Sequence, residues 1–197
     1  FGLGQLADKI IMALQEYHLK YPLRQGPSRE EIRSRFSKNV NSKTFNLILK
    51  ELEADKKIEI QDQQIRMPGH EPSPGERELQ VIQLIKSRMK ENLFTPPSVE
   101  SLREAAGIEE DDLMEILAYL TKEKVLVKIN PDMYFLQNAL EEGKNRLNQY
   151  FEQEKELSLA TFRDMLNTTR KYALPLLEYY DKIRFTHRVG DARIKTK

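Results

Sequence analysis

The chain has 197 residues, a net charge of +1, no cysteine, and 39% hydrophobic and 32% charged side chains. Without cysteine there is no disulfide framework and no thiolate metal site, as is common in a reducing cytosol; we expect a soluble, cytoplasmic protein. Apolar stretches are too short to span a bilayer, so no membrane partner is expected. The chain has few glycine and proline residues and starts at Phe1 without Met, which predicts a helix-rich fragment of a longer protein.

The first part of the chain predicts three helices followed by a hairpin. Apolar residues recur at helical spacing between residues 6 and 21, which indicates the first helix. Ser28 followed by Glu31 is a capping box that predicts the start of the second. Residues 41–55 form the third helical pattern, and residues 57–67 read as two short strands around a polar turn.

The same order of elements recurs twice more, after a Pro/Gly-rich break at "EPSPGE". The predicted elements are helices at 76–92, 98–107 and 109–123 with a hairpin at 125–136, then helices at 139–154, 158–166 and 168–182 with a hairpin at 183–195. Ser98 and Ser158 are expected N-caps, and Gly107 is an expected helix stop.

Three helices followed by a two-stranded hairpin, within about sixty residues, is the order of a winged helix, a helix-turn-helix variant. We therefore predict a mostly α fold with small β-hairpins, arranged as three tandem winged-helix domains. Their expected boundaries are 1–68, 69–136 and 137–197. Winged helices bind nucleic acid or dock proteins, so the fold alone leaves both functions open.

Charge is distributed unevenly over these three domains. The first and third each carry twelve basic and nine acidic residues, whereas the second carries eight and thirteen. The third helix of the second domain opens with acids at residues 109–112, which would repel phosphate. The first domain has Lys43 near the start of its third helix and acids further along, which allows a weak contact at most. The second domain is therefore expected to be a spacer.

The last thirty residues hold eight basic and three acidic side chains. Alternation along the last hairpin assigns its side chains to two faces. The predicted inner face holds Ile183, Phe185, His187, Ala192 and Ile194. The predicted outer face holds Arg184, Thr186, Arg188, Arg193, Lys195 and Lys197. All charged residues on that outer face are positive, so this hairpin is the one expected to meet an anion.

The third helix of the third domain adds a second cationic feature. Thr168 or Thr169 is the expected cap, followed directly by Arg170 and Lys171. Free N–H groups at a helix start, together with two cations, suit a phosphate. Further along, Glu178 and Asp181 are predicted to face outward, which disfavours insertion of the helix into a DNA major groove. We expect the helix start and the hairpin to hold an RNA backbone together.

Several residues near this site have two interpretations from sequence. Pro175 either fits the core as a tolerated kink or aims the two preceding cations, and Tyr172 lies at the edge of the core stripe. His187 is either packed or in contact with a base. Arg163 either pairs with Asp164 or meets a phosphate.

The tip of the last hairpin contains two turn residues. Gly190 is expected to have a positive φ angle. Asp191 either closes the turn or orders a neighbouring arginine.

The stretches "RKYALPLLEY" at 170–179 and "RVGDAR" at 188–193 carry a family resemblance. They resemble the C-terminal winged-helix extension of the bacterial selenocysteine-specific translation elongation factors. The likeness is strongest over residues 158–195. Residues 6–33 also resemble an internal domain of that extension.

This resemblance implies that the last domain binds an mRNA hairpin, the selenocysteine insertion element, and tethers a GTPase that delivers selenocysteyl-tRNA near a UGA codon. The implied ribosome and tRNA contacts belong to the full-length factor, and a tandem single chain is expected to be a monomer. With the residues considered above, the candidate RNA-binding set is Arg163, Arg170, Lys171, Tyr172, Arg184, His187, Arg188, Asp191 and Arg193. The alternatives are a DNA-binding regulator and a protein-docking array.

No enzymatic activity is expected in this chain. It lacks the phosphate-binding motif G-x-x-x-x-G-K-[ST], so we expect GTP and Mg²⁺ to bind only in the missing N-terminal part of the factor. The three histidines, His18, His70 and His187, are far apart in sequence and lack the spacing of metal ligands. No cofactor or catalytic residue is therefore assigned.

Overall fold

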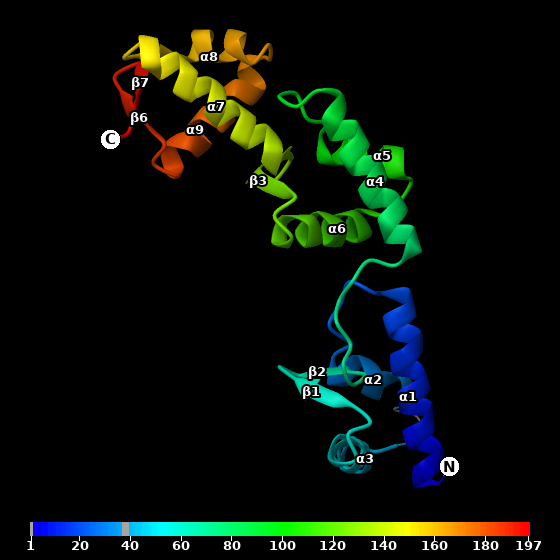
Figure 1. Cartoon of the computed structure of the whole chain (residues 1–197). Helices are drawn as coiled ribbons and strands as arrows, with labels where there is room; N and C mark the ends of the chain where they lie inside the picture. The colour runs from blue at the N-terminus through cyan, green and yellow to red at the C-terminus, as the bar shows by residue number, and fades with distance from the viewer. Residues whose placement is uncertain (1, 37–39) are drawn as a thin grey trace. The chain divides into compact units, whose positions relative to one another are not determined.

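A computed structural model describes residues 2–36 and 40–197 (Figure 1). The described chain forms two compact units, one ending at Leu79 and the other beginning at Gln80. Helices alternate with small antiparallel strand pairs, which confirms the predicted fold class. None of the helices within these residues is both long and apolar enough to cross a membrane.

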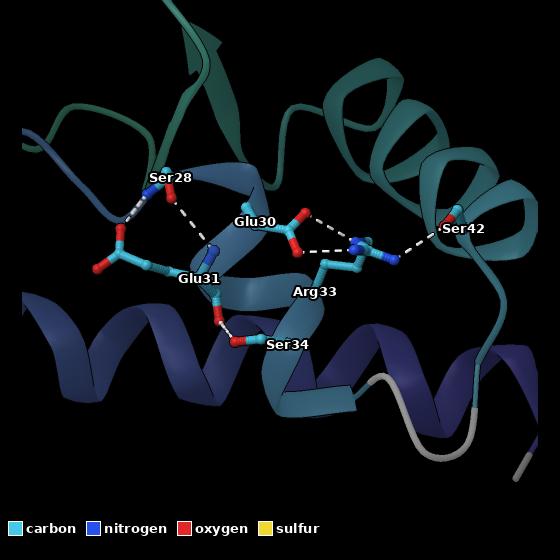
Figure 2. Close-up of polar contacts among 6 residues, drawn as sticks. All are labelled: Ser28, Glu30, Glu31, Arg33, Ser34 and Ser42. Atoms are coloured by element: carbon cyan, nitrogen blue, oxygen red, sulfur yellow. Dashed lines mark hydrogen bonds and ion pairs between the residues drawn. The ribbon is translucent and has the colours of Figure 1, made fainter.

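The first unit contains the first repeat of three helices and a hairpin. Its elements are α1 (Leu3–Lys20), α2 (Arg29–Phe36), α3 (Ser42–Ala54), β1 (Glu59–Gln61) and β2 (Gln64–Arg66). Its core is formed by the apolar stripes that the sequence predicts on α1 and α3, and these stripes are buried. Figure 2 shows the capping box of α2: Glu31 N–H donates to Ser28 Oγ at 3.1 Å, and Ser28 N–H to Glu31 Oε2 at 2.7 Å.

The second and third repeats follow in the same order. The second consists of α4 (Glu76–Glu91), α5 (Val99–Ala106), α6 (Glu110–Lys122), β3 (Leu126–Asn130) and β4 (Met133–Leu136). The third consists of α7 (Gln137–Gln153), β5 (Leu157–Ser158), α8 (Leu159–Met165), α9 (Arg170–Lys182), β6 (Thr186–Val189) and β7 (Ala192–Lys195). These two repeats share the second compact unit. The predicted domain boundaries after residues 68 and 136 stay a prediction.

The predicted helix ends are observed. Ser98 Oγ accepts from Ser101 N–H, and Ser158 Oγ accepts from Thr161 N–H. Gly107 ends α5 at φ +62°, in the left-handed region that suits glycine. Local capping chemistry therefore determines where these short helices begin and stop.

The sequence did not predict β5. This two-residue strand pairs with β7, so that the third sheet has the order β5-β7-β6. Leu157 lies opposite Arg193 and Ser158 opposite Ala192. Two residues are too few for a visible alternation, and only the pairing with β7 identifies them as a strand.

The third helix of every repeat ends in the same way. α3, α6 and α9 each have 13 residues, and each is followed, after one residue, by a non-glycine residue with positive φ. These residues are Lys56, Lys124 and Arg184, with φ angles of 55°, 57° and 59°. The next N–H then donates to a carbonyl in the last turn of the helix at 2.9 Å in all three repeats. This left-handed turn directs the chain into the hairpin.

A glycine in α7 allows a buried tyrosine to pack closely. Tyr180 of α9 is fully buried, and its hydroxyl donates to the carbonyl of Leu140 at 2.7 Å. A Cβ at Gly143 would collide with that hydroxyl. Burial also raises the pKa of Tyr180 above its usual range, so the group stays a hydrogen-bond donor.

We expect Gly143→Ala to lower the free energy of unfolding of the second unit by about 2 kcal/mol, because the added methyl group overpacks the core. The helix propensity of alanine, worth up to about 1 kcal/mol, only partly offsets this cost. Urea unfolding followed by circular dichroism measures the difference. Asn145→Ala, an exposed site on the same helix, is the control and should stay within about 0.5 kcal/mol of the wild type. Equal stability of the two variants would contradict the packing argument.

Two histidines that are far apart in sequence stack in the first unit. The rings of His18 and His70 lie 3.6 Å apart between centroids. His18 Nε2 accepts from the N–H of Met67 at 3.1 Å, and His70 Nε2 lies 2.9 Å from the carbonyl of Arg24. Burial, and secondarily His70, lower the pKa of His18 to about 4. The stack holds the segment after β2 against α1 while His18 is neutral.

Acidification should therefore destabilise the first unit. The folded pKa of His18 lies below the usual histidine value of 6.5, so the unfolded chain binds more protons between about pH 4 and 6.5. Stability is expected to fall as the pH drops through that window, and His18→Gln should flatten the dependence. Thermal unfolding monitored at several pH values tests this. His187→Gln, at an exposed site in the third repeat, serves as the control; identical profiles for wild type and His18→Gln would refute the linkage.

Candidate nucleic-acid interface

The start of α9 presents two exposed cations. Arg170 and Lys171 are both exposed, and Lys171 Nζ lies 5.3 Å from the centroid of the half-buried Tyr172 ring. Thr169 is the N-cap, but its side chain makes no capping hydrogen bond. The first N–H groups of the helix therefore lack a side-chain cap, and their partial positive charge adds to the two cations.

The other candidate cap, Thr168, fastens the third repeat to the second. Its hydroxyl donates to the carbonyl of Phe94 at 2.6 Å and lies 3.1 Å from Thr95 Oγ1. The guanidinium of Arg146 lies 5.1 Å from the Phe94 ring centroid and donates to the carbonyl of Met165 at 3.1 Å. The second repeat thus supports the residue that immediately precedes the N-cap of α9.

These contacts of Thr168 with Phe94 and Thr95 form a seam between the second and third repeats. A cavity of about 210 Å³ lies beside this seam. From the second repeat it is lined by Pro96, Ser98, Asn130, Asp132 and Met133, and from α9 by Lys171, Tyr172 and Pro175. Pro175 lies inside α9, as the sequence predicts, and α9 continues through it to Lys182. The proline ring thus lines a space between repeats.

The predicted outer face of the last hairpin is only partly observed. Its residues Arg184, Arg188, Lys195 and Lys197 are exposed as predicted, but its other two residues are buried. The register pairs Arg188 with Arg193 and His187 with Ile194, so the two sets of residues were grouped correctly. Thr186 and Arg193, however, are buried at 0% and 5% exposure, whereas His187 is exposed. The prediction that Arg193 faces outward and His187 inward is wrong, because a half-buried carboxylate of α9 binds Thr186 and Arg193.

That carboxylate belongs to Asp181. Its Oδ1 accepts from the hydroxyl of Thr186 at 2.7 Å, and its Oδ2 accepts from Arg193 Nε at 3.2 Å. Asp181 is only partly exposed, so the prediction that it faces outward is also wrong, whereas Glu178 is exposed as predicted. One side chain of α9 therefore anchors both β6 and β7, and Arg193 acts in this structure as an anchor.

The tip of the hairpin keeps its charge in solvent. Gly190 has φ +61°, which confirms its predicted role in the turn. Arg188 Nε donates to the Gly190 carbonyl at 2.8 Å, and its Nη2 lies 3.8 Å from the exposed carboxylate of Asp191. Asp191 therefore orders the neighbouring arginine, while 63% of the Arg188 side chain remains accessible.

Arg163 and Arg184 have local structural roles. Arg163 pairs with Asp164 at 2.8 Å, the first of the two interpretations from sequence. Arg184 is exposed and occupies the left-handed turn after α9. Because Lys124 holds the same position in the acidic second repeat, a cation there is not specific to the third repeat. RNA contact by either arginine stays a prediction.

Two family models, both described as "Elongation factor SelB, winged helix", match residues 11–67 and 149–194. Together they cover more than half of the chain. The chain belongs to the SelB winged-helix family.

Full-length SelB proteins share this similarity along almost the whole chain. The selenocysteine-specific elongation factor of Desulfomicrobium baculatum is 31% identical over 191 residues, which are 97% of this chain and 30% of that protein. The Escherichia coli factor is 25% identical over 185 residues, 93% of this chain and 29% of that protein. This chain therefore spans about 30% of the length of these relatives.

Two solved structures share the architecture. One is the mRNA-binding domain of E. coli SelB in complex with SECIS RNA, with 25% identity and a TM-score of 0.53 over 63% of this chain and all of that one. The other is a bacterial selenocysteine-specific elongation factor, EF-Sec, with a TM-score of 0.58 over 99% of this chain and 30% of that one. At 24% identity the second similarity shows the fold alone.

Three residues that organise this candidate interface were not among the sequence candidates. Thr168 was considered only as a cap, Asp181 only as an outward acid, and Thr186 only as part of the outer face. Their partners lie in other elements, so spacing along the chain carried no signal. Within residues 2–36 and 40–197, no group of three or more potential metal ligands occurs.

We expect Arg193→Met to lower the free energy of unfolding of the second unit by about 2 kcal/mol, because Asp181 loses a charged hydrogen-bond donor inside the protein. Urea unfolding measures the loss. Arg170→Met removes an exposed arginine with no ion pair among the described residues and should change stability by no more than about 0.5 kcal/mol. A stability loss as small as that of the control would show that the hairpin of β6 and β7 does not depend on the contact between Arg193 and Asp181.

Proposed function

We propose that the third repeat binds an mRNA hairpin, the selenocysteine insertion element, and that the other two repeats connect it to the rest of a full-length elongation factor. The observation that carries this proposal is the group of exposed cations at the uncapped start of α9 and at the wing tip: Arg170, Lys171 and Arg188. The similarity to the E. coli SelB domain in complex with SECIS RNA supports it.

The expected contact is with the RNA backbone rather than the floor of a groove. The major groove of A-form RNA is too deep and narrow for side chains to read, so a protein grips phosphates, 2′-hydroxyls and unpaired bases instead. A helix start supplies N–H donors for one phosphate, and Arg188 supplies a forked donor for another. Tyr172, half-buried beside Lys171, is positioned at the edge of this surface.

The proposal gives this chain a binding role in translation, in the cytoplasm, and no catalytic step. GTP and Mg²⁺ would bind elsewhere in a full-length factor, as would selenocysteyl-tRNA. The ribosome would be reached through the same factor. By holding the hairpin, this chain would raise the local concentration of that factor near a UGA codon.

Lys171→Ala and Arg188→Ala are each expected to weaken hairpin binding about tenfold, the equivalent of about 1.4 kcal/mol. Each should also reduce the salt dependence, the slope of log K against log salt concentration, by about 0.7 to 0.9, because one phosphate contact is lost. Fluorescence anisotropy with a labelled insertion-element hairpin, titrated at several salt concentrations, measures both quantities.

Arg103→Ala in the second repeat removes one positive charge that is already paired with Glu100, and it should leave hairpin affinity unchanged. A hairpin with a scrambled loop and a DNA duplex are the competitor ligands. Equal binding of the wild-type chain to all three would reject selective hairpin recognition. Tight binding to DNA alone would instead favour a DNA-binding regulator.

A further inference from the structure

The third helix of the first repeat has a groove on its outward face. This groove, of about 430 Å³, is lined by Lys43, Thr44, Asn46, Leu47 and Lys50 of α3. The opposite face of α3 is buried in the core of the first unit. The groove therefore lies on the surface that a helix-turn-helix protein uses to meet nucleic acid.

The two lysines of the groove are available for an anion. Neither Lys43 nor Lys50 forms an ion pair with another residue in the described ranges, and both are exposed. Two other cations of the same repeat do form ion pairs: Lys57 lies 3.6 Å from Asp55, and Arg66 lies 2.8 Å from Glu59. The two groove lysines thus differ from these paired cations.

The three third helices can be compared position by position, because each has 13 residues. The second position holds Lys43 in α3, Lys171 in α9 and Asp111 in α6. The ninth holds Lys50 in α3, where α9 has Glu178 and α6 has Ala118. α3 thus shares the leading lysine of the proposed hairpin-binding helix and carries a second cation two turns later.

The start of α3 is held in place by α2, as Figure 2 shows. Arg33 Nη1 donates to Ser42 Oγ at 3.0 Å, while its Nε and Nη2 bind both carboxylate oxygens of Glu30 at 2.9 and 2.6 Å. Asn41 caps the helix by accepting from Thr44 N–H at 2.8 Å. These contacts fix the N-terminal end of α3, so the groove begins beside the positive end of the helix dipole.

We propose that the outward face of α3, defined by the five groove residues above, is a second RNA-binding surface. It takes the phosphate backbone of an RNA segment distinct from the hairpin held by the third repeat. Lys43 and Lys50 are about 10 Å apart along the helix axis, so each can neutralise a different phosphate. Thr44 and Asn46 supply uncharged donors for phosphate or 2′-hydroxyl oxygens. The choice of RNA over DNA rests on the proposed function.

An RNA suits this face better than a protein does. Protein interfaces depend on a desolvated apolar centre, usually aromatic. Here Leu47, 52% exposed, is the single large apolar side chain among the groove residues. Two lysines, a threonine and an asparagine accompany it, and their ammonium, hydroxyl and amide groups suit a salt-sensitive contact with an RNA backbone.

The test uses the complete chain and a blunt RNA duplex of about 16 base pairs with no insertion-element sequence. Lys43→Ala/Lys50→Ala should weaken duplex binding about tenfold and reduce the salt slope by about 1.5, the loss of two phosphate contacts. Binding of the insertion-element hairpin, titrated separately, should change less than about twofold. Fluorescence anisotropy measures both affinities, and melting curves check that the variant remains folded.

Lys20→Ala/Lys57→Ala removes the same charge from the first repeat outside the groove, and should bind the duplex like the wild type. If the control lost as much duplex affinity as the groove variant, the effect would come from net charge alone. If the groove variant lost no duplex affinity, the groove would not bind RNA. Either result overturns the proposal. A DNA duplex bound as tightly as RNA, or a poly-glutamate peptide bound more tightly, would overturn the assignment to RNA. Failure of the wild-type chain to bind the hairpin would separately refute the proposed function.

Discussion

Each wing depends on one backbone constraint, the left-handed turn at the end of the preceding helix. Lys56, Lys124 and Arg184 adopt it in the three repeats, although none is glycine. A non-glycine residue in this region costs about 1–3 kcal/mol, and the following N–H bond to the last helical turn helps to offset that cost. This turn therefore sets the direction in which the hairpin leaves the helix in each repeat.

The third repeat adds a polar anchor to that constraint. Asp181 accepts hydrogen bonds from Thr186 and Arg193, so an acid in a cationic region serves to hold the wing rather than to repel a ligand. On the other side, Thr168 ties the start of the same helix to the second repeat. The helix that presents Lys171 is thereby fixed near both ends, which lowers the entropy lost when its cations meet a ligand.

The three repeats share one framework and differ mainly in surface charge. At the second position of the third helix, Lys43 and Lys171 would attract phosphate, whereas Asp111 would repel it. The acidic second repeat contributes instead to the seam, through Phe94 and Thr95. A single architecture can therefore serve for binding in one copy and for support in another, because function resides in surface side chains.

Periodicity and capping residues such as Ser28, Ser98 and Ser158 were enough to predict the repeated element order, since these signals act within a few residues of the chain. Grouping the last hairpin into two faces was equally local. Which face turns inward was decided by Asp181, a residue of another element, and the strand at Leu157 exists only through its pairing with β7. Long-range partners of this kind leave no periodic trace in the sequence, so only the tertiary structure reveals that Arg193 is an anchor and His187 is exposed.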